Sequence, residues 1–226
     1  MTTTFTRARW AVGLSSMLAV GAIARYPGGN RVDHASLGYS VFRNFLSDLG
    51  MTISFSGKPN TLGATFFVLS LLLVVLGLGG CLIGFVRLCS ESSRQRQLAQ
   101  GAAGVGLIVC AAFIGVALTP ENRLMSLHIW LTLFAFRVLP IAALLMVFAS
   151  MSSRVLPRRI TVAWAILTVV LTAYVYVIGW GPPTSTTEGL TFQVTAQKLV
   201  AIASVSILVY LSVQADRVVA TVRRDR

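Results

Sequence analysis

The sequence predicts an all-α fold: a polytopic membrane helix bundle with six transmembrane helices and one outer interfacial helix. Composition is the first reason, because 55% of the residues are hydrophobic and only 12% are charged, whereas soluble domains carry about 25% charged residues. The second reason is a mean hydropathy of +0.78. The third is that the apolar residues form long segments separated by short polar ones, so we expect these segments to face lipid.

Each apolar segment approaches or exceeds the roughly 20 residues that a helix needs to cross the hydrocarbon core. Together the segments define a single transmembrane domain over residues 1–226. The expected spans are residues 10–26, 62–86, 101–118, 127–151, 160–180 and 191–213. Gly80 and Gly84 in the second span, with Gly101 and Gly104 in the third, indicate close helix contacts. We expect these two helices to pack as an antiparallel pair.

The first span has two interpretations. Arg7 and Arg9 precede a 15-residue apolar run that ends in Ala22-Ile23-Ala24, which is the pattern of a cleavable signal peptide. The same run is also long enough for a short membrane helix, and cleavage would leave five spans instead of six. We favour a retained helix, and cleavage stays open as the alternative.

The positive residues alternate between the two sides of the predicted membrane. The N-terminus, the links between spans two and three and between spans four and five, and the C-terminus together hold 12 of the 19 Lys and Arg residues. The positive-inside rule therefore places both termini in the cytoplasm. Because these residues lie in short runs between apolar segments and not in a basic domain, the positive charge does not indicate nucleic-acid binding.

The longest loop, residues 27–61, is expected on the outer side and is predicted to contain an amphipathic helix within residues 36–49. The apolar residues at helical spacing are Phe42, Phe45, Leu46 and Leu49. Such a helix would lie across the outer end of the bundle. Asn44 and Asp48 are four residues apart, so they should point in the same direction.

Ionisable residues inside apolar spans cost roughly 2.5–3.5 kcal/mol each to insert and therefore indicate functional sites. Arg137 lies about ten residues into the fourth span, and Lys198 lies about seven residues into the sixth, close to Gln193 and Gln197. We expect Arg137 to face the bundle interior, within reach of Asp48 or the two glutamines. Lys198 should approach the same cavity from the sixth helix.

The outer half of the chain carries more cations than the positive-inside rule predicts. Its seven cations are Arg25, Arg31, Arg43, Lys58, Arg123, Arg137 and Lys198, and its four acids are Asp33, Asp48, Glu121 and Glu188. An anionic membrane lipid would explain the surplus. The candidate ligand-binding residues are Asp48, Arg137, Lys198, Gln197, Gln193, Asn44, Arg43 and His128.

The sequence leaves the catalytic residues unassigned and predicts no metal site. His34 and His128 are the only histidines, and the chain has no HExxH, GxSxG or P-loop motif. A zinc site would also need Asp33, Asp48 or Glu121. We therefore expect no metal and no cofactor, and we leave open whether the protein is an enzyme.

Several short motifs resemble a known family. Asn44-Phe45-Leu46-Ser47-Asp48-Leu49-Gly50 resembles a motif of domain-of-unknown-function family 998, a family of prokaryotic six-helix membrane proteins. Further polar motifs fall at similar places: Pro59-Asn60, Thr119-Pro120-Glu121-Asn122 with His128, and Gly189-Leu190 before Gln197-Lys198. The layout is also similar to that of the Frag1/DRAM/Sfk1 group. The resemblance implies a six-helix architecture in the inner (plasma) membrane, and it implies no activity.

Four functions stay open on the sequence alone. The first is an outward-facing, net positive pocket that binds an anionic lipid headgroup or a similar small anion. The second is a membrane-embedded lipid hydrolase or transferase with Asp48 or His128 as the general base. The third is a small-solute transporter, and the fourth is a structural or regulatory subunit without a ligand. The oligomeric state is open in every case.

Overall fold

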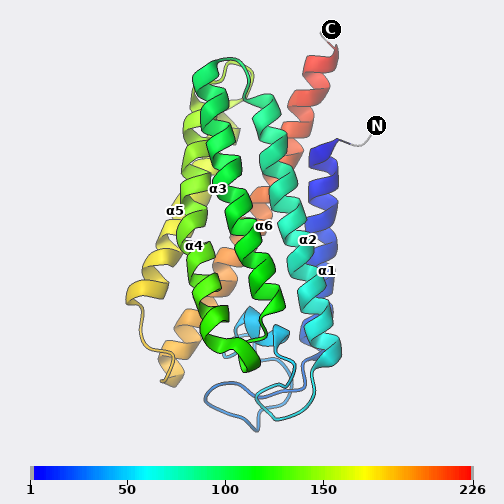
Figure 1. Cartoon of the computed structure of the whole chain (residues 1–226), viewed down its shortest axis with the longest axis vertical. Helices are drawn as coiled ribbons and strands as arrows, with labels where there is room; N and C mark the ends of the chain where they lie inside the picture. Colours follow the sequence, from blue (N-terminus) through cyan, green and yellow to red (C-terminus); the bar gives the residue numbers. More distant parts are fainter. Residues whose placement is uncertain (1–2, 225–226) are drawn as a thin grey trace.

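The computed structural model describes residues 3–224, which fold into an elongated helix bundle (Figure 1). Its elements are α1 (Thr4–Arg25), η1 (Leu46–Gly50), α2 (Thr61–Leu88), α3 (Ser93–Leu118), α4 (Glu121–Met151), α5 (Arg158–Trp180) and α6 (Thr187–Arg224). Both chain ends lie at one end of the bundle, and residues 26–60 cover the other (Figure 1). We call these the terminal end and the loop end.

The all-α class and the six long helices are confirmed. Five of them, α2 to α6, are long and apolar enough to cross a membrane. The helix α1 has 22 residues and a length of about 33 Å at 1.5 Å per residue, but it is not among the five, because Arg7, Arg9 and Arg25 make it more polar. Most helices extend beyond the predicted spans, since polar turns continue the helix past the apolar segment.

Small residues bring α2 close to its neighbours, although the pairing differs from the expected one. Gly84 faces α1, and a Cβ atom at this position would lie only 2.7 Å from the Phe5 ring. The predicted contact with α3 also exists, but it is made by Leu82, whose side chain occupies the space beside Gly106. The Gly80–Gly84 pair therefore serves the packing of α1 on α2 and not that of α2 on α3.

The helix α1 is joined to α6 at the terminal end by a polar cluster around Asp216. Arg9 forms an ion pair with this carboxylate, and Thr6 donates a hydrogen bond of 2.8 Å to it. Thr3, the N-cap residue of α1, donates a further hydrogen bond to the same group. These contacts come from residues more than 200 positions apart, so they fix the first helix to the last.

The predicted interfacial helix over residues 36–49 is wrong. Only Leu46–Gly50 is helical, as a short 3-10 turn, and Phe42 is 61% exposed instead of packed on the bundle. The reason is local competition by polar side chains. The Asn44 side chain accepts a hydrogen bond from the backbone N–H of Ser40, and such bonds favour turns over a continuous α-helix.

Candidate functional site at the loop end

The turn η1 is inserted into the loop end of the bundle, where it contacts α2, α4 and α6 (Figure 1). We call residues 44–51 the plug. Its centre is fully enclosed, because Asp48, Leu49 and Gly50 are all buried. Position 50 requires glycine because the backbone lies close to α2. A Cβ atom there would lie 2.7 Å from the ring of Phe67.

Buried side-chain amides hold the backbone of the plug. Asn44 donates through Nδ2 to the carbonyl of Gly29 and to Asp48 Oδ2, each at 2.9 Å. Asn60 donates to the carbonyls of Leu49 and Met51, again at 2.9 Å. These bonds satisfy backbone groups that would otherwise be buried without partners.

A glutamine of α6 also supports the plug. Gln197 Oε1 accepts a hydrogen bond of 2.7 Å from the backbone N–H of Leu46. The two asparagines and this glutamine therefore have a structural role. The sequence had instead predicted that Asn44 and Gln197 bind a ligand.

Asp48 is the acidic centre of the plug, with an exposed fraction of 0%. Its Oδ2 accepts hydrogen bonds from Asn44 Nδ2 and from the backbone N–H of Phe45. Its Oδ1 has no hydrogen-bond partner among the described residues. Burial, followed by repulsion from Glu121, raises the pKa of Asp48 from 3.8 to about 7, against the lowering effects of the Asn44 hydrogen bond and of Arg31.

Two cations lie beside the plug. Arg31 forms an ion pair with the buried Glu121, and its guanidinium carbon lies 5.3 Å from the centre of the Phe45 ring. Lys198 donates a hydrogen bond to the Asn44 carbonyl and lies 5.2 Å from the centre of the Tyr39 ring. The structure therefore brings Asp48, Asn44, Gln197 and Lys198 together, as the sequence interpretation expected.

Three other predicted residues lie apart from this cluster. Gln193 donates to the carbonyls of Val177 and Pro182, near the end of α5. The His128 Nδ1 atom is 2.6 Å from the carbonyl of Thr119, at the corner between α3 and α4, and its Nε2 is buried without a partner among the described residues. Arg43 is exposed on the loop.

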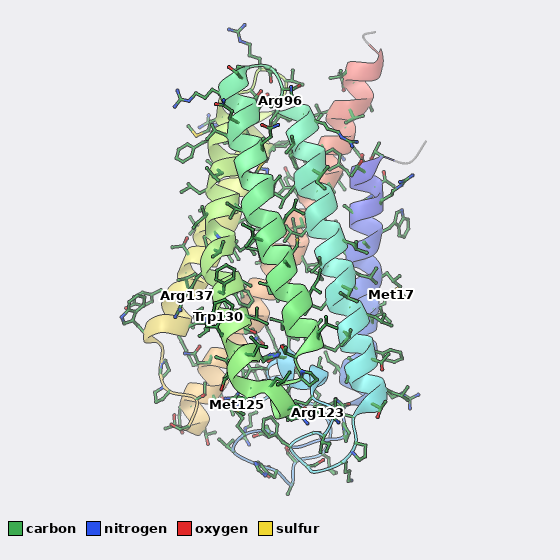
Figure 2. All side chains as sticks on the ribbon, viewed as in Figure 1. Met17, Arg96, Arg123, Met125, Trp130 and Arg137 are labelled. Carbon is green, nitrogen blue, oxygen red and sulfur yellow. The ribbon has the colours of Figure 1, made fainter. Side chains whose placement is uncertain are left out.

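The prediction that Arg137 faces the bundle interior is wrong, because its side chain is exposed. Figure 2 shows it on the outside of the bundle, on the same flank as Trp130. The interior face of α4 is formed by small residues, among them Ala135 and Ala142, which are almost completely buried against other helices. Close packing on that face leaves no space for a guanidinium. Asp48 is instead paired with Asn44.

A groove of about 600 Å³ opens on the surface beside the plug. Its walls come from the loop, α2 and the corner before α4: Gly50, Thr52, Ile53, Pro59, Thr61, Ala64, Thr65, Val68, Leu69, Pro120 and Arg123. None of them is among the predicted ligand-binding residues. No sequence pattern indicated this groove, since its walls are separated along the chain and carry no common motif.

The acids and cations toward the loop end differ in burial. Asp48 and Glu121 are buried, Asp33 is partly buried and Glu188 is exposed. The exposed cations are Arg25, Arg43, Lys58, Arg123 and Arg137. The surface of this end is therefore more positive than its residue composition alone would indicate. Within residues 3–224, no three His, Cys, Asp or Glu side chains are grouped in a way that could hold a metal ion.

Comparison of the chain with protein-family models, with curated sequences and with solved structures finds no match. The resemblance to family 998 therefore stays a prediction.

Proposed function

We propose that the protein binds an anionic lipid at the loop end of the bundle, with the lipid headgroup in the groove beside the plug. The observation that carries this proposal is the composition of that groove. One part is apolar and follows α2 through Val68 and Leu69, while the other part contains three threonines and Arg123. A surface that is apolar at one end and carries donors and a cation at the other is complementary to an acidic amphiphile.

We further propose six membrane-crossing helices, including α1, with both termini in the cytoplasm and the protein in the inner (plasma) membrane. The contacts of Asp216 with α1 support a retained first helix, since cleavage after Ala24 would remove a helix that is fixed to α6. The concentration of Arg residues at the terminal end supports the orientation. The loop end then faces outward.

The level of the groove along α2 agrees with a headgroup site. The hydrocarbon core is about 30 Å thick, which corresponds to 20 helical residues. Twenty residues counted back from Leu88, at the terminal end of α2, end at Val68. The groove residues from Thr61 to Thr65 therefore lie at headgroup level, and the exposed side chains of Leu69 and Leu76 continue below them, where an acyl chain would lie.

The headgroup is expected to be acidic because of the groups that can contact it. Arg123 is exposed at the groove (Figure 2) and can donate charged hydrogen bonds to a phosphate. Thr61 adds a hydroxyl group at the groove, whereas the Thr52 and Thr65 hydroxyls already donate to Asn122 Oδ1 and to the Thr61 carbonyl. No Asp or Glu side chain lines the groove among the described residues, since the two nearest acids are buried in and behind the plug.

The test is lipid titration of the purified protein, followed by native mass spectrometry. Phosphatidylglycerol and phosphatidylcholine with identical acyl chains are compared on the unmodified protein, on Arg123→Gln and on the control Arg25→Gln. Arg25 is an exposed arginine at the same end that does not line the groove. A basic residue near the membrane surface contributes about 1 kcal/mol to binding of an acidic lipid, so Arg123→Gln should weaken phosphatidylglycerol binding about fivefold.

The control variant should bind phosphatidylglycerol as tightly as the unmodified protein. Equal retention of both lipids, or equal losses in both variants, would contradict the proposal. The structural-subunit interpretation would then be preferred, because the buried amides already have a structural role in the plug.

A further inference from the structure

A single charged residue interrupts an apolar stripe along α4. The stripe residues recur at alternating spacings of four and three: Trp130, Phe134, Arg137, Ile141, Leu144 and Phe148. Such spacing places side chains on one face of a helix. All six side chains are partly or well exposed. The five apolar ones are typical of residues that face acyl chains.

Arg137 has no counter-charge among the described residues. Among residues 3–224, none forms an ion pair or a side-chain hydrogen bond with its guanidinium. Hydrocarbon offers no hydrogen-bond acceptor, so a guanidinium on this face must obtain one from outside the chain or reach the interface. The exposed position therefore indicates an anionic partner.

Aromatic side chains mark the level of the membrane interface near Arg137. Trp130 lies 21 residues from the end of α4 at Met151, about 32 Å at 1.5 Å per residue. Trp180 lies 22 residues from the start of α5 at Arg158, about 33 Å by the same rise. Both are well exposed, at 60% and 74%, and exposed tryptophans at equal height are typical of a membrane interface.

Arg137 lies below this level but is directed toward it. It is 14 residues from Met151, about 21 Å along the helix, and therefore about 9 Å inside a core of about 30 Å. Side chains on a helix tilt toward its N-terminus, and α4 begins at the loop end (Figure 1). The long side chain can thus extend toward the headgroups of the nearer leaflet.

We propose that Arg137 binds the phosphate of a phospholipid in the leaflet at the loop end, and draws this headgroup below the general level of the interface, next to Trp130. This site is separate from the groove beside the plug. It relies on the membrane placement proposed above, but not on the binding of any lipid in the groove.

Within a second copy of the chain, none of the described acids is placed to supply the anion. The acids of the described chain are Asp33, Asp48, Glu91, Glu121, Glu188 and Asp216. All of them lie in the loop end, in the links or near helix ends, and none lies at the depth of Arg137 in an apolar span. Phosphate, by contrast, is present in every phospholipid and needs to descend only a short distance.

The experiment counts phospholipids that remain bound to the purified protein by native mass spectrometry. The protein is saturated with phosphatidylglycerol and compared with Arg137→Leu, Arg137→Lys and Arg123→Gln. Arg137→Leu should lose one bound phospholipid, with occupancy of that site reduced at least about tenfold. It should keep the lipid that Arg123→Gln binds about fivefold more weakly. Arg137→Lys should retain partial occupancy, since an ammonium keeps the charge but not the two-pronged donor geometry.

A further arm replaces the phospholipid with diacylglycerol, which has the same acyl chains and no phosphate. Diacylglycerol should not occupy the Arg137 site. An unchanged phospholipid count in Arg137→Leu, or equal retention of diacylglycerol, would overturn the proposal. So would conversion of an oligomer to a monomer by Arg137→Leu without loss of lipid, because the partner of Arg137 would then be protein. Failure of the groove proposal is recognised separately, as an unchanged affinity of Arg123→Gln for phosphatidylglycerol in the titration described above.

Discussion

Replacing Asp48 by Asn should stabilise the protein above neutral pH. The carboxyl group of Asp48 is fully buried, and Oδ2 accepts two hydrogen bonds that an Asn carbonyl oxygen would accept equally well. The amide group would occupy the place of Oδ1, which has no partner among the described residues. The substitution therefore keeps the shape and the hydrogen bonds of the plug and removes only the charge.

The magnitude follows from the two pKa values of Asp48. The unfolded chain releases this proton near 3.8, whereas the folded protein keeps it up to about 7. Because the folded state binds the proton more tightly, stability falls as pH rises from about 4 to about 7 and then levels off. Each pH unit between the two pKa values corresponds to about 1.36 kcal/mol, so the free energy of unfolding falls by roughly 4 kcal/mol. This is equivalent to roughly 10 °C in Tm for a chain of this size.

Several ionisable groups lie around Asp48 and influence its titration. Arg31 and the tyrosines Tyr26 and Tyr39 face it from the loop, Glu121 faces it from α4, and Lys198 faces it from α6. The negative charge of Asp48 adds to burial in raising the pKa values of both tyrosines.

The assay is thermal unfolding of the purified protein in detergent at about pH 5 and about pH 8. Asp48→Asn should have the higher Tm at the higher pH, and its Tm should change less between the two conditions than that of the unmodified protein. Asp33→Asn is the matched control, since Asp33 lies in the same loop and is only partly buried. A lower Tm of Asp48→Asn at both pH values, or an unchanged pH dependence, would refute the assignment of a neutral Asp48.

Two further predictions concern the plug and the topology. Asn60→Ala leaves the buried carbonyls of Leu49 and Met51 without donors, so it should cost about 1–3 kcal/mol per lost bond. Replacing the exposed Asn122, which accepts a hydrogen bond from Thr52, by Ala should lower the free energy of unfolding by less than about 0.5 kcal/mol. Equal Tm losses for both variants would contradict the structural role of Asn60. For the topology, a cysteine at position 56 should be labelled from outside intact cells and one at position 92 should be protected, and the reverse pattern would invert the orientation.

Local sequence properties were sufficient to predict the helices. A helix long enough to cross a membrane is specified by the length of a single apolar segment, so each of the six predicted spans coincides with a helix. The four-residue spacing of Asn44 and Asp48 also predicted that they point in the same direction, and the structure shows a hydrogen bond of 2.9 Å between them. The helix expected around them did not form, because short polar side chains bring together residues four apart in a turn as well.

Only the tertiary structure decided which way the polar residues face. Arg137 occupies the exposed side of α4 because Ala135 and Ala142 pack on the other side, and the choice of face depends on which neighbours a helix meets. Gln197 meets the backbone of Leu46 across 151 positions of the chain, a contact without a local signature. The groove beside the plug is likewise assembled from separate segments. Helix formation depends on hydrogen bonds and burial within one segment, whereas the site depends on how segments pack, and packing is specified by all of them together.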